Sequence, residues 1–321
     1  MENVQSKLNK FFRSTFQILG LLAAVAVVSS GPPLIRAASA ATAQVQTPVQ
    51  PSRRDSELLE DFLKSPNGEP GDNLFHAAFA AGPAIIPQLQ AALKDDRTAE
   101  FAAQSLAFIG GPKARAILAT LVSDPRDLDL RRFYYGSLGE FNDPESTTTL
   151  FNVVNQADRE ADRTVVEAAI LALSVRSAPG LAQRLREVEK TVQDYVLQDD
   201  METAATVIEL RAKYLSTPAG KSAGSSIDQA IRTYFIPALE APPEDIPPGE
   251  APPSASIRVQ ELTFSPDKNR ALAHVIFETP QALAHYRIVL QRRQGAWATA
   301  SAWLGQETEK EEPKPPEPAK P

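Results

Sequence analysis

The chain has 321 residues, an apolar content of 43% and a formal net charge of −7. This length allows two modest domains with a hydrophobic core. An acidic chain repels phosphate backbones, so nucleic-acid binding is not expected. The sequence contains no cysteine, which excludes disulfides, thiolate metal sites and a cysteine nucleophile.

The first 43 residues are typical of an export signal. Basic residues precede an apolar run, Ile18–Val28, and small residues follow the run up to Ala43. We therefore predict a signal peptide over residues 1–43, cleaved after Ala40 or Ala43, and a periplasmic or secreted location. An uncleaved membrane anchor is the alternative, although the apolar run is shorter than the roughly 20 residues of a spanning helix. Residues 44–56 are polar and Pro-containing, which is typical of a linker.

The stretch Arg97–Ser123 predicts two short helices joined by a tight turn. Apolar residues at helical spacing precede and follow the break at Gly110-Gly111-Pro112. Glycine suits the end of a helix, and proline suits the first turn of the next one. The residues expected in the core of this hairpin are Leu106, Ile117, Leu118 and Leu121.

Three further units repeat this order of helix, break and helix. A short helix over residues 55–64 precedes them, and a final helix from Met201 to Leu215 follows. One hairpin cannot bury its apolar stripe alone, so successive units are expected to stack on one another. The breaks of the three units lie at Gly82-Pro83, Asn142-Asp143-Pro144 and Ser177-Ala178-Pro179.

The segment Ala102–Leu121 follows the pattern A-A-x-x-L-x-x-I-G-x-P-x-A-x-x-x-L-x-x-L. This pattern resembles the short, Ala-rich HEAT-like repeats first named for phycobilisome lyases. The resemblance implies a mainly α fold, a right-handed α-solenoid of about four helical hairpins over residues 57–215. Two units depart from the pattern, because Asp143 and Ala178 replace the glycine before proline. A tetratricopeptide array, with its period of about 34 residues, is the alternative.

The apolar period changes from helical to alternating in the last third of the chain. Residues 216–225 are small and flexible, which is typical of a linker. A helix is expected from Ser226 to Pro237, and alternating residues then predict four strands with short connections. The sequence thus predicts a small α+β domain over residues 226–305, one helix on a four-stranded antiparallel meander that folds independently of the repeats. Residues 306–321 are rich in Pro, Glu and Lys, which predicts a disordered tail.

A helix followed by a meander with tryptophan in its last strand resembles the second half of nuclear-transport-factor-like sheets. The resemblance is one of topology and rests on no motif. It implies a cone-shaped sheet of the kind that can hold small molecules.

Motifs for catalysis, nucleotides and metals are absent from the sequence. It contains no G-x-x-x-x-G-K-[ST], G-x-G-x-x-G, H-E-x-x-H or G-x-S-x-G motif. His274 and His285 lie on neighbouring predicted strands and could face each other, but no acidic residue at ligand spacing completes a metal site. His76 is expected to be a partly exposed helix residue. We therefore predict no catalytic, cofactor-binding or metal-binding residues.

The densest cluster of cations and aromatic rings begins the third repeat. Such residues are enriched at protein interfaces, which makes the cluster a candidate partner-binding site. The competing interpretation is that two of the rings pack between repeats while the arginines pair with Asp127 or Asp129. The candidate partner-binding residues are Arg131, Arg132, Tyr134 and Tyr135.

Stacked helix pairs make extended concave surfaces that bind other proteins. We therefore expect an exported, non-catalytic HEAT-repeat scaffold or adaptor that binds protein partners through its solenoid surface. We expect it to use no cofactor, to bind no nucleic acid and to have no membrane attachment once the signal peptide is cleaved. The alternative is a small-ligand-binding protein or enzyme with a pocket in the α+β domain. A deep apolar pocket in residues 226–305 would favour this alternative, and a filled interface between sheet and helix would favour the scaffold.

Overall fold

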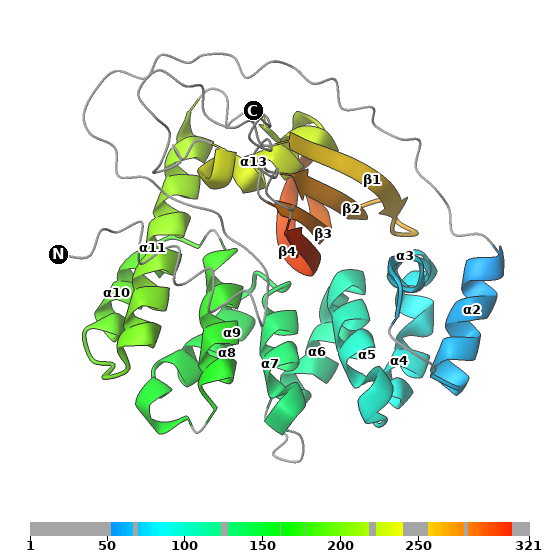
Figure 1. Cartoon of the computed structure of the whole chain (residues 1–321), viewed down its shortest axis with the longest axis horizontal. Helices are drawn as coiled ribbons and strands as arrows, with labels where there is room; N and C mark the ends of the chain where they lie inside the picture. The colour runs from blue at the N-terminus through cyan, green and yellow to red at the C-terminus, as the bar shows by residue number, and fades with distance from the viewer. Residues whose placement is uncertain are drawn as a thin grey trace, which may run out of the picture.

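The computed structural model describes residues 53–66, 70–122, 128–160, 162–176, 178–217, 223–239, 256–278 and 282–309. The predicted signal peptide lies outside these residues. A mostly helical region is followed by one helix and a small sheet (Figure 1). The α-helices are α2 (Arg53–Lys64), α3 (Asp72–Ala81), α4 (Ile86–Ala92), α5 (Asp96–Ile109), α6 (Gly111–Leu121), α7 (Leu128–Leu138), α8 (Pro144–Val154), α9 (Arg163–Ser174), α10 (Leu181–Glu189), α11 (Tyr195–Ser216) and α13 (Ile227–Leu239). Short 3-10 helices are η1 (Gly82–Ile85), η2 (Ala157–Arg159) and η3 (Ala223–Ser225).

The helices before α13 form two layers. In the first layer, α3, α5, α7, α9 and α11 each contact the next member of the series. Helices α4, α6, α8 and α10 pack against members of this layer from the other side, and α2 packs on α3 at the end of the row (Figure 1). Within the described residues, no helix is long and apolar enough to span a membrane.

The predicted breaks coincide with helix ends. Gly110 ends α5 with a φ of 72°, a conformation that glycine adopts without strain, and Pro112 lies in the first turn of α6. The Asp143 side chain accepts a hydrogen bond from the Ser146 N–H and so caps α8 in place of a glycine turn. Asp194 caps α11 in the same way, so this helix begins at Tyr195, before the predicted start at Met201.

The core residues predicted for the central hairpin differ in burial. Leu106 and Leu118 are fully buried. Ile117 and Leu121 are only partly buried and pack against the edge of the same core. The helical register of this unit is therefore confirmed, with its outer helix buried along a narrower stripe than predicted.

The sheet is the predicted antiparallel meander, with strands in the order β1-β2-β3-β4. Two boundaries differ from the prediction. Helix α13 continues past Pro237 to Leu239, and β4 runs through residues 306–309, which the sequence had assigned to the tail. The strands are β1 (Ser256–Phe264), β2 (Arg270–Glu278), β3 (Ala282–Arg293) and β4 (Ala296–Glu309).

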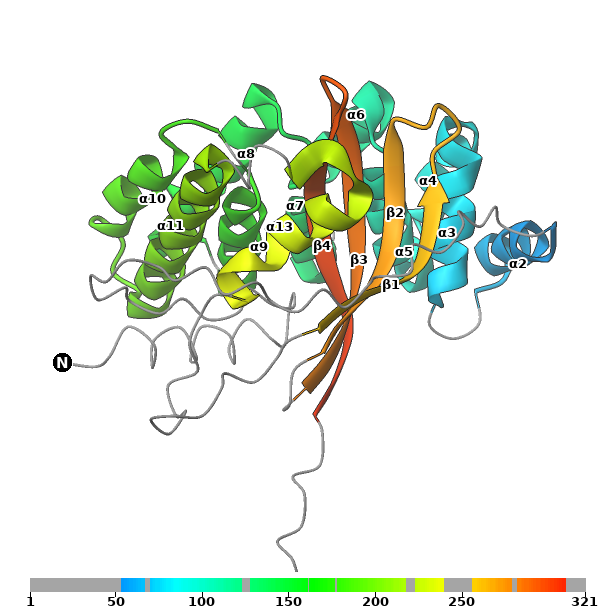
Figure 2. The same cartoon turned by 90° about the horizontal axis from the view of Figure 1, so that it is seen from above.

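The sheet lies between α13 and the first helical layer (Figure 2). On one face, Phe235 of α13 stacks on Phe277 and meets the edge of Tyr286. On the other face, Leu272, Val289 and Trp303 belong to the same hydrophobic core as the helices. The predicted domain boundary lies at the end of α11, but the sheet shares a hydrophobic core with the helices that precede this boundary.

Candidate functional site

Polar side chains from distant parts of the chain meet where α3 packs on the sheet. Asp72 is the first residue of α3. Its carboxylate accepts a hydrogen bond of 2.6 Å from Nε of Arg287 on β3 and lies 3.3 Å from Nδ1 of His274 on β2. Asp72 therefore joins the N-terminus of α3 to two strands of the sheet.

Two of the three histidines of the chain, His76 and His274, lie near this carboxylate, and the third, His285, contacts His274. His274 and His285 do face each other, with 3.0 Å between Nε2 of His274 and Nδ1 of His285. His76 is buried rather than partly exposed as predicted, and its Nδ1 lies 2.8 Å from the Thr263 hydroxyl. Its Nε2 lies 3.7 Å from a carboxylate oxygen of Glu261.

The ionisation of this histidine cluster follows from burial and from its charged neighbours. Burial lowers the pKa of His76 to about 4, although the Asp72 carboxylate opposes the shift. Burial likewise lowers the pKa of His274, against the effect of Asp72. Burial alone would raise the pKa of Asp72, but the charges of Arg287 and His274 outweigh it and lower that pKa. At neutral pH the cluster thus holds a neutral His76 beside an ionised Asp72.

The cluster does not have the geometry of a metal centre. Within the part of the chain that the structure describes, no group of three or more His, Asp or Glu side chains is arranged to hold a metal ion. His274 uses Nδ1 toward Asp72 and Nε2 toward His285, so both its nitrogens already have partners. The arrangement is instead a hydrogen-bonded connection between α3 and the sheet.

A second polar connection lies at the end of α7. The Glu140 side chain is fully buried. One of its carboxylate oxygens accepts hydrogen bonds from Nε1 of Trp303, at 2.7 Å, and from the Ser301 hydroxyl on β4. The other oxygen lies 3.7 Å from Nη2 of Arg270. Burial raises the pKa of Glu140 to about 7, and the Arg270 charge opposes this rise.

Arg270 fixes the position of this carboxylate relative to the helices. Its Nε donates to the Phe108 carbonyl at 3.0 Å, and its Nη2 donates to the Ala107 carbonyl at 3.3 Å. These are carbonyls in the last turn of α5, where the helix dipole favours a cation. Glu140 and Arg270 therefore join α5 and α7 to the sheet.

The candidate partner-binding cluster on α7 is divided between the core and the surface. Tyr134 and Tyr135 are buried, with 2% and 7% of their surface exposed. Arg131 donates two hydrogen bonds to Glu160, at 3.1 and 3.0 Å. The Arg132 guanidinium lies 4.7 Å from the centre of the Phe133 ring.

These positions favour the packing interpretation of the α7 cluster. The two tyrosine rings fill space between elements, and Glu160 takes the role of the expected acidic partner of Arg131. The side chains of Asp127 and Asp129 lie outside the described residues. Partner binding by the arginines of this cluster stays a prediction.

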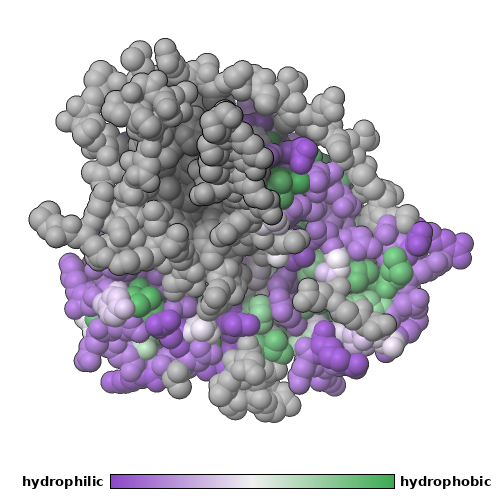
Figure 3. Space-filling view, in the orientation of Figure 1, coloured by the Kyte–Doolittle hydropathy of each residue, from purple (hydrophilic) through white to green (hydrophobic). Residues whose placement is uncertain are grey.

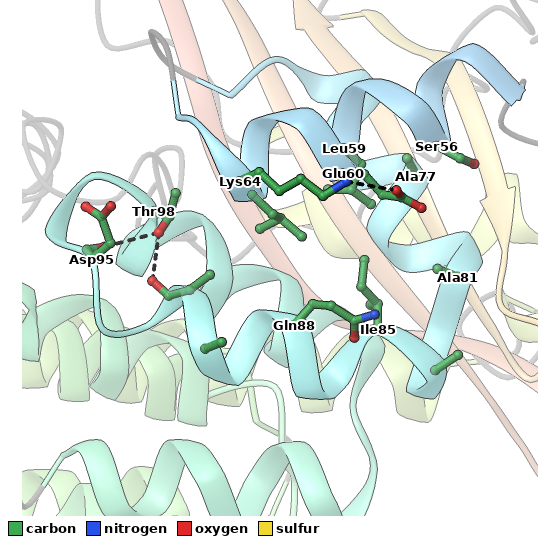
Figure 4. A pocket seen from close by; sticks show the side chains of 14 residues that line it. Ser56, Leu59, Glu60, Lys64, Ala77, Ala81, Ile85, Gln88, Asp95 and Thr98 are labelled. Atoms are coloured by element: carbon green, nitrogen blue, oxygen red, sulfur yellow. Dashed lines mark hydrogen bonds and ion pairs between the residues drawn. The ribbon is translucent and has the colours of Figure 1, made fainter.

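An apolar groove lies between α2 and α4. Figure 4 shows Leu59 on α2 and Ile85 and Gln88 on the opposite side of this groove. The groove has a volume of about 610 Å³. Lys64 and Glu60 form an ion pair along its α2 edge. In Figure 3, hydrophobic surface appears among hydrophilic residues on the side of the molecule where α2, α3 and α4 lie.

Comparison of the sequence with known proteins does not identify a function for these sites. No protein-family model matches the chain, and no curated protein matches it significantly.

Proposed function

We propose that the chain is an exported, non-catalytic scaffold or adaptor of HEAT-like helical hairpins that binds a partner protein. The groove between α2 and α4 is the observation that carries this proposal, because it is open, apolar and formed by exposed helix faces. The two-layer order of the helices supports the assignment to an α-solenoid.

The usual binding surface of a helical solenoid is covered here by the chain's own sheet. The first helical layer contacts the strands through His76 of α3, Phe108 of α5 and Glu140 after α7. A partner therefore has to bind elsewhere. The groove is an apolar surface that this arrangement leaves beside the covered layer, at the α2 end of the row.

The occupant that fits this groove best is an amphipathic helix of the partner. Helices α2 and α4 form its walls together with the end of α3, and the small residues Ala81, Ala84 and Ala91 let another backbone approach closely. The larger apolar side chains Leu63 and Ile85 can contact apolar residues spaced three and four positions apart on one face of the partner's helix. Glu60 and Lys64 neutralise each other at the edge, so the groove selects apolar contact rather than charge.

The competing proposal, a ligand pocket between sheet and helix, has less support. Phe235 and Phe277 stack with 5.0 Å between ring centres, and Tyr286 meets Phe235 at 5.1 Å. These rings are buried and fill the centre of the space that a ligand would need. A filled interface favours the scaffold.

A photo-reactive amino acid placed in the groove tests the proposal. Ala91 is exposed and lines the groove, whereas Gln90 is exposed on the same helix outside it. We expect crosslinks to one partner protein from position 91 and not from position 90, and loss of that product in A84K. Equal products from both positions would contradict the proposal. A crosslink from position 91 to the chain's own N-terminal segment would show that the groove is filled internally.

Export has a separate test. N-terminal sequencing of the protein from its native cells should begin after Ala40 or Ala43. An intact Met1 on a cytoplasmic species would overturn the export signal and leave the partner-binding proposal standing.

A further inference from the structure

All three histidines of the chain lie at one interface, between α3 and the sheet. His76 is on α3, His274 on β2 and His285 on β3. His76 is 2% exposed, and the His274 side chain is 12% exposed. Histidine is the side chain that ordinarily gains its positive charge between about pH 8 and about pH 5. Acid therefore adds charge to a contact that is largely closed to water.

When both rings are neutral, one arrangement of protons fits the contact between His274 and His285. The 3.0 Å between Nε2 of His274 and Nδ1 of His285 requires a proton on one nitrogen and a lone pair on the other. Asp72 is ionised and lies 3.3 Å from Nδ1 of His274, so this nitrogen carries the proton of the neutral ring. Nε2 of His274 is then the acceptor, and His285 donates to it from Nδ1.

The pair accepts one further proton in place, but not two. The first can enter at Nε2 of His285, the nitrogen outside the contact. A second would have to enter at Nε2 of His274, and both nitrogens of the contact would then be donors. Two adjacent cations would also repel each other across 3.0 Å. Full protonation of the pair therefore breaks the contact.

The carboxylates beside the histidines compensate little of this charge. Asp72 already accepts a hydrogen bond of 2.6 Å from Arg287. Glu261 lies 3.7 Å from Nε2 of His76, but burial raises the pKa of Glu261, so acid neutralises it sooner than an exposed glutamate. Burial lowers the pKa of His274, and the opposing effect of Asp72 is smaller. The titratable and charged groups around the three rings are Asp72 on α3, Glu261 on β1, Glu278 farther along β2 and Arg287 on β3.

Helix α3 connects this interface with the groove. Asp72 and His76, four residues apart, contact the sheet from one side of the helix. Ala77 and Ala81, also four residues apart, line the groove from a neighbouring side. Figure 1 shows α3 between the end of the sheet and α4. A change in how α3 packs on the sheet therefore reaches the groove.

We propose that acid releases α3 from the sheet, because protonation of the three histidines places more positive charge in this contact than its carboxylates neutralise. In the released form the rings are hydrated, and each takes its own proton. The connection through Glu140 has the opposite dependence, since its contribution returns as pH falls, so the sheet stays attached to α5 and α7. The release of α3 does not depend on the function proposed above, whereas its effect on partner binding in the groove rests on that function.

Hydrogen exchange of the full chain, corrected for the intrinsic effect of pH on exchange, measures this release at about pH 7.5 and about pH 5. We expect the amides of α3 to lose protection by about tenfold or more at the lower pH, because a ten-residue helix is marginal without its packing. The amides of α9 and of β4 near Trp303 should keep theirs. Unchanged protection of α3, or an equal loss in all elements, would overturn the proposal.

Two substitutions attribute the release to the histidines. Asparagine at position 285 can donate to a neutral His274 and, with its amide turned, can accept from a protonated one. H285N and H76Q should therefore each reduce the acid loss of protection in α3, and H76Q/H285N should remove most of it. Each variant is compared with itself at the two pH values, so a general loss of stability does not imitate the effect. An undiminished acid loss in H76Q/H285N would overturn the proposal.

A fluorescent label on α3 tests whether the release reaches the groove. The chain contains no cysteine, so a bimane label on A81C reports from one exposed position in the groove. We expect its emission to shift between the two pH values, and the shift to disappear in the H76Q/H285N background. Q90C, exposed on α4 outside the groove, should show no shift. A constant emission from A81C would overturn the effect on the groove. Neither measurement needs a partner, so the absence of a crosslink from position 91 would leave both results unchanged.

Discussion

The two faces of the sheet are both buried, but their chemistry differs. The face toward α13 is aromatic and aliphatic, with Phe277 and Tyr286 packed on Phe235. The face toward the helices places Trp303 beside a buried carboxylate, Glu140, and surrounds its apolar residues with histidine and arginine. Polar residues on alternate strand positions are usually solvated, yet here they form the contact between sheet and helices.

The two faces of the sheet should therefore differ in how well they tolerate substitution of their side chains. On the α13 face, any apolar group of the right volume stabilises the contact. On the helical face, each buried polar group needs its own partner, and loss of one leaves the other unsatisfied. The pairs join residues far apart in sequence, since Asp72 and Arg287 are separated by 215 positions and Glu140 and Trp303 by 163. The polar pairs on the helical face therefore fix the position of the sheet relative to the helices.

The largest expected effect comes from separating the two parts of the chain. We expect residues 223–309 alone to lack a cooperative thermal transition, because Leu272, Val289 and Trp303 would be exposed. Mixing with a fragment of residues 53–217 should restore a β-rich circular dichroism spectrum and a cooperative melt. A cooperative melt of the isolated fragment would show that α13 and the sheet suffice, as the sequence predicted.

Truncation of one large residue on each face compares the two contacts directly. F235A and W303A should each destabilise the full chain by about 3–5 kcal/mol in urea unfolding, since both side chains are buried. The milder W303F keeps most of the ring but removes the donor to Glu140, and should still cost about 1–3 kcal/mol. A loss below about 1 kcal/mol for W303A would mean that the helical face of the sheet is not buried in solution.

Glu140 makes stability on the helical face depend on pH. Its pKa is raised to about 7 in the folded protein, so its contribution is complete below the unfolded value of 4.5 and is lost as pH rises through 7. E140Q keeps the shape but cannot ionise. We expect its stability relative to the wild type to increase by about 2–3 kcal/mol between about pH 5 and about pH 8. A constant difference across this range of urea melts would place Glu140 in contact with water.

The sequence predicted the elements of this fold better than it predicted how they are joined. The spacing of apolar residues predicted the helices, their breaks at Gly110 and Asp143, and the four-strand meander, because these features depend on residues close together in the sequence. It also predicted that His274 and His285 could meet across one hairpin, and they do so as diagonal neighbours, since His274 pairs with Arg287 in the register of the strands. The acidic neighbour of the pair was missed because Asp72 comes from the other end of the chain.

The burial of isolated polar residues was equally hard to predict. Asp200 is buried within α11, and burial raises its pKa to about 8. Arg211 of α11 is also buried, although the apolar pattern of this helix does not predict burial of its guanidinium. Such burial depends on which helix faces meet in the stack, and single-sequence periodicity defines that only for apolar stripes.

The smallest expected effect concerns His76, on the acid side of the stability profile. Its pKa is lowered to about 4 from 6.5, so its contribution is complete above 6.5 and is lost as pH falls toward 4. The groups that face it are Asp72 on α3, Glu261 on β1, His274 on β2 and Arg287 on β3. Between about pH 7 and about pH 5 the wild type should lose about 2 kcal/mol through this residue.

Substitution by a neutral amide isolates this effect. H76Q can still bond to the Thr263 hydroxyl but does not titrate, so its stability in urea unfolding should rise by about 2 kcal/mol relative to that of the wild type over the same acid range. Glu140 titrates over the same range with the opposite sign, because its contribution returns as pH falls from 7 toward 4.5. The comparison is therefore repeated in an E140Q background, where the H76Q/E140Q double variant should lose about 2 kcal/mol less on acidification than E140Q alone. If H76Q and the wild type lose stability in parallel on acidification, His76 is hydrated in solution. The contact between α3 and the sheet would then rest on Asp72 and Arg287, at the exposed edge of the interface, and the helical face would be less dependent on specific polar partners than proposed.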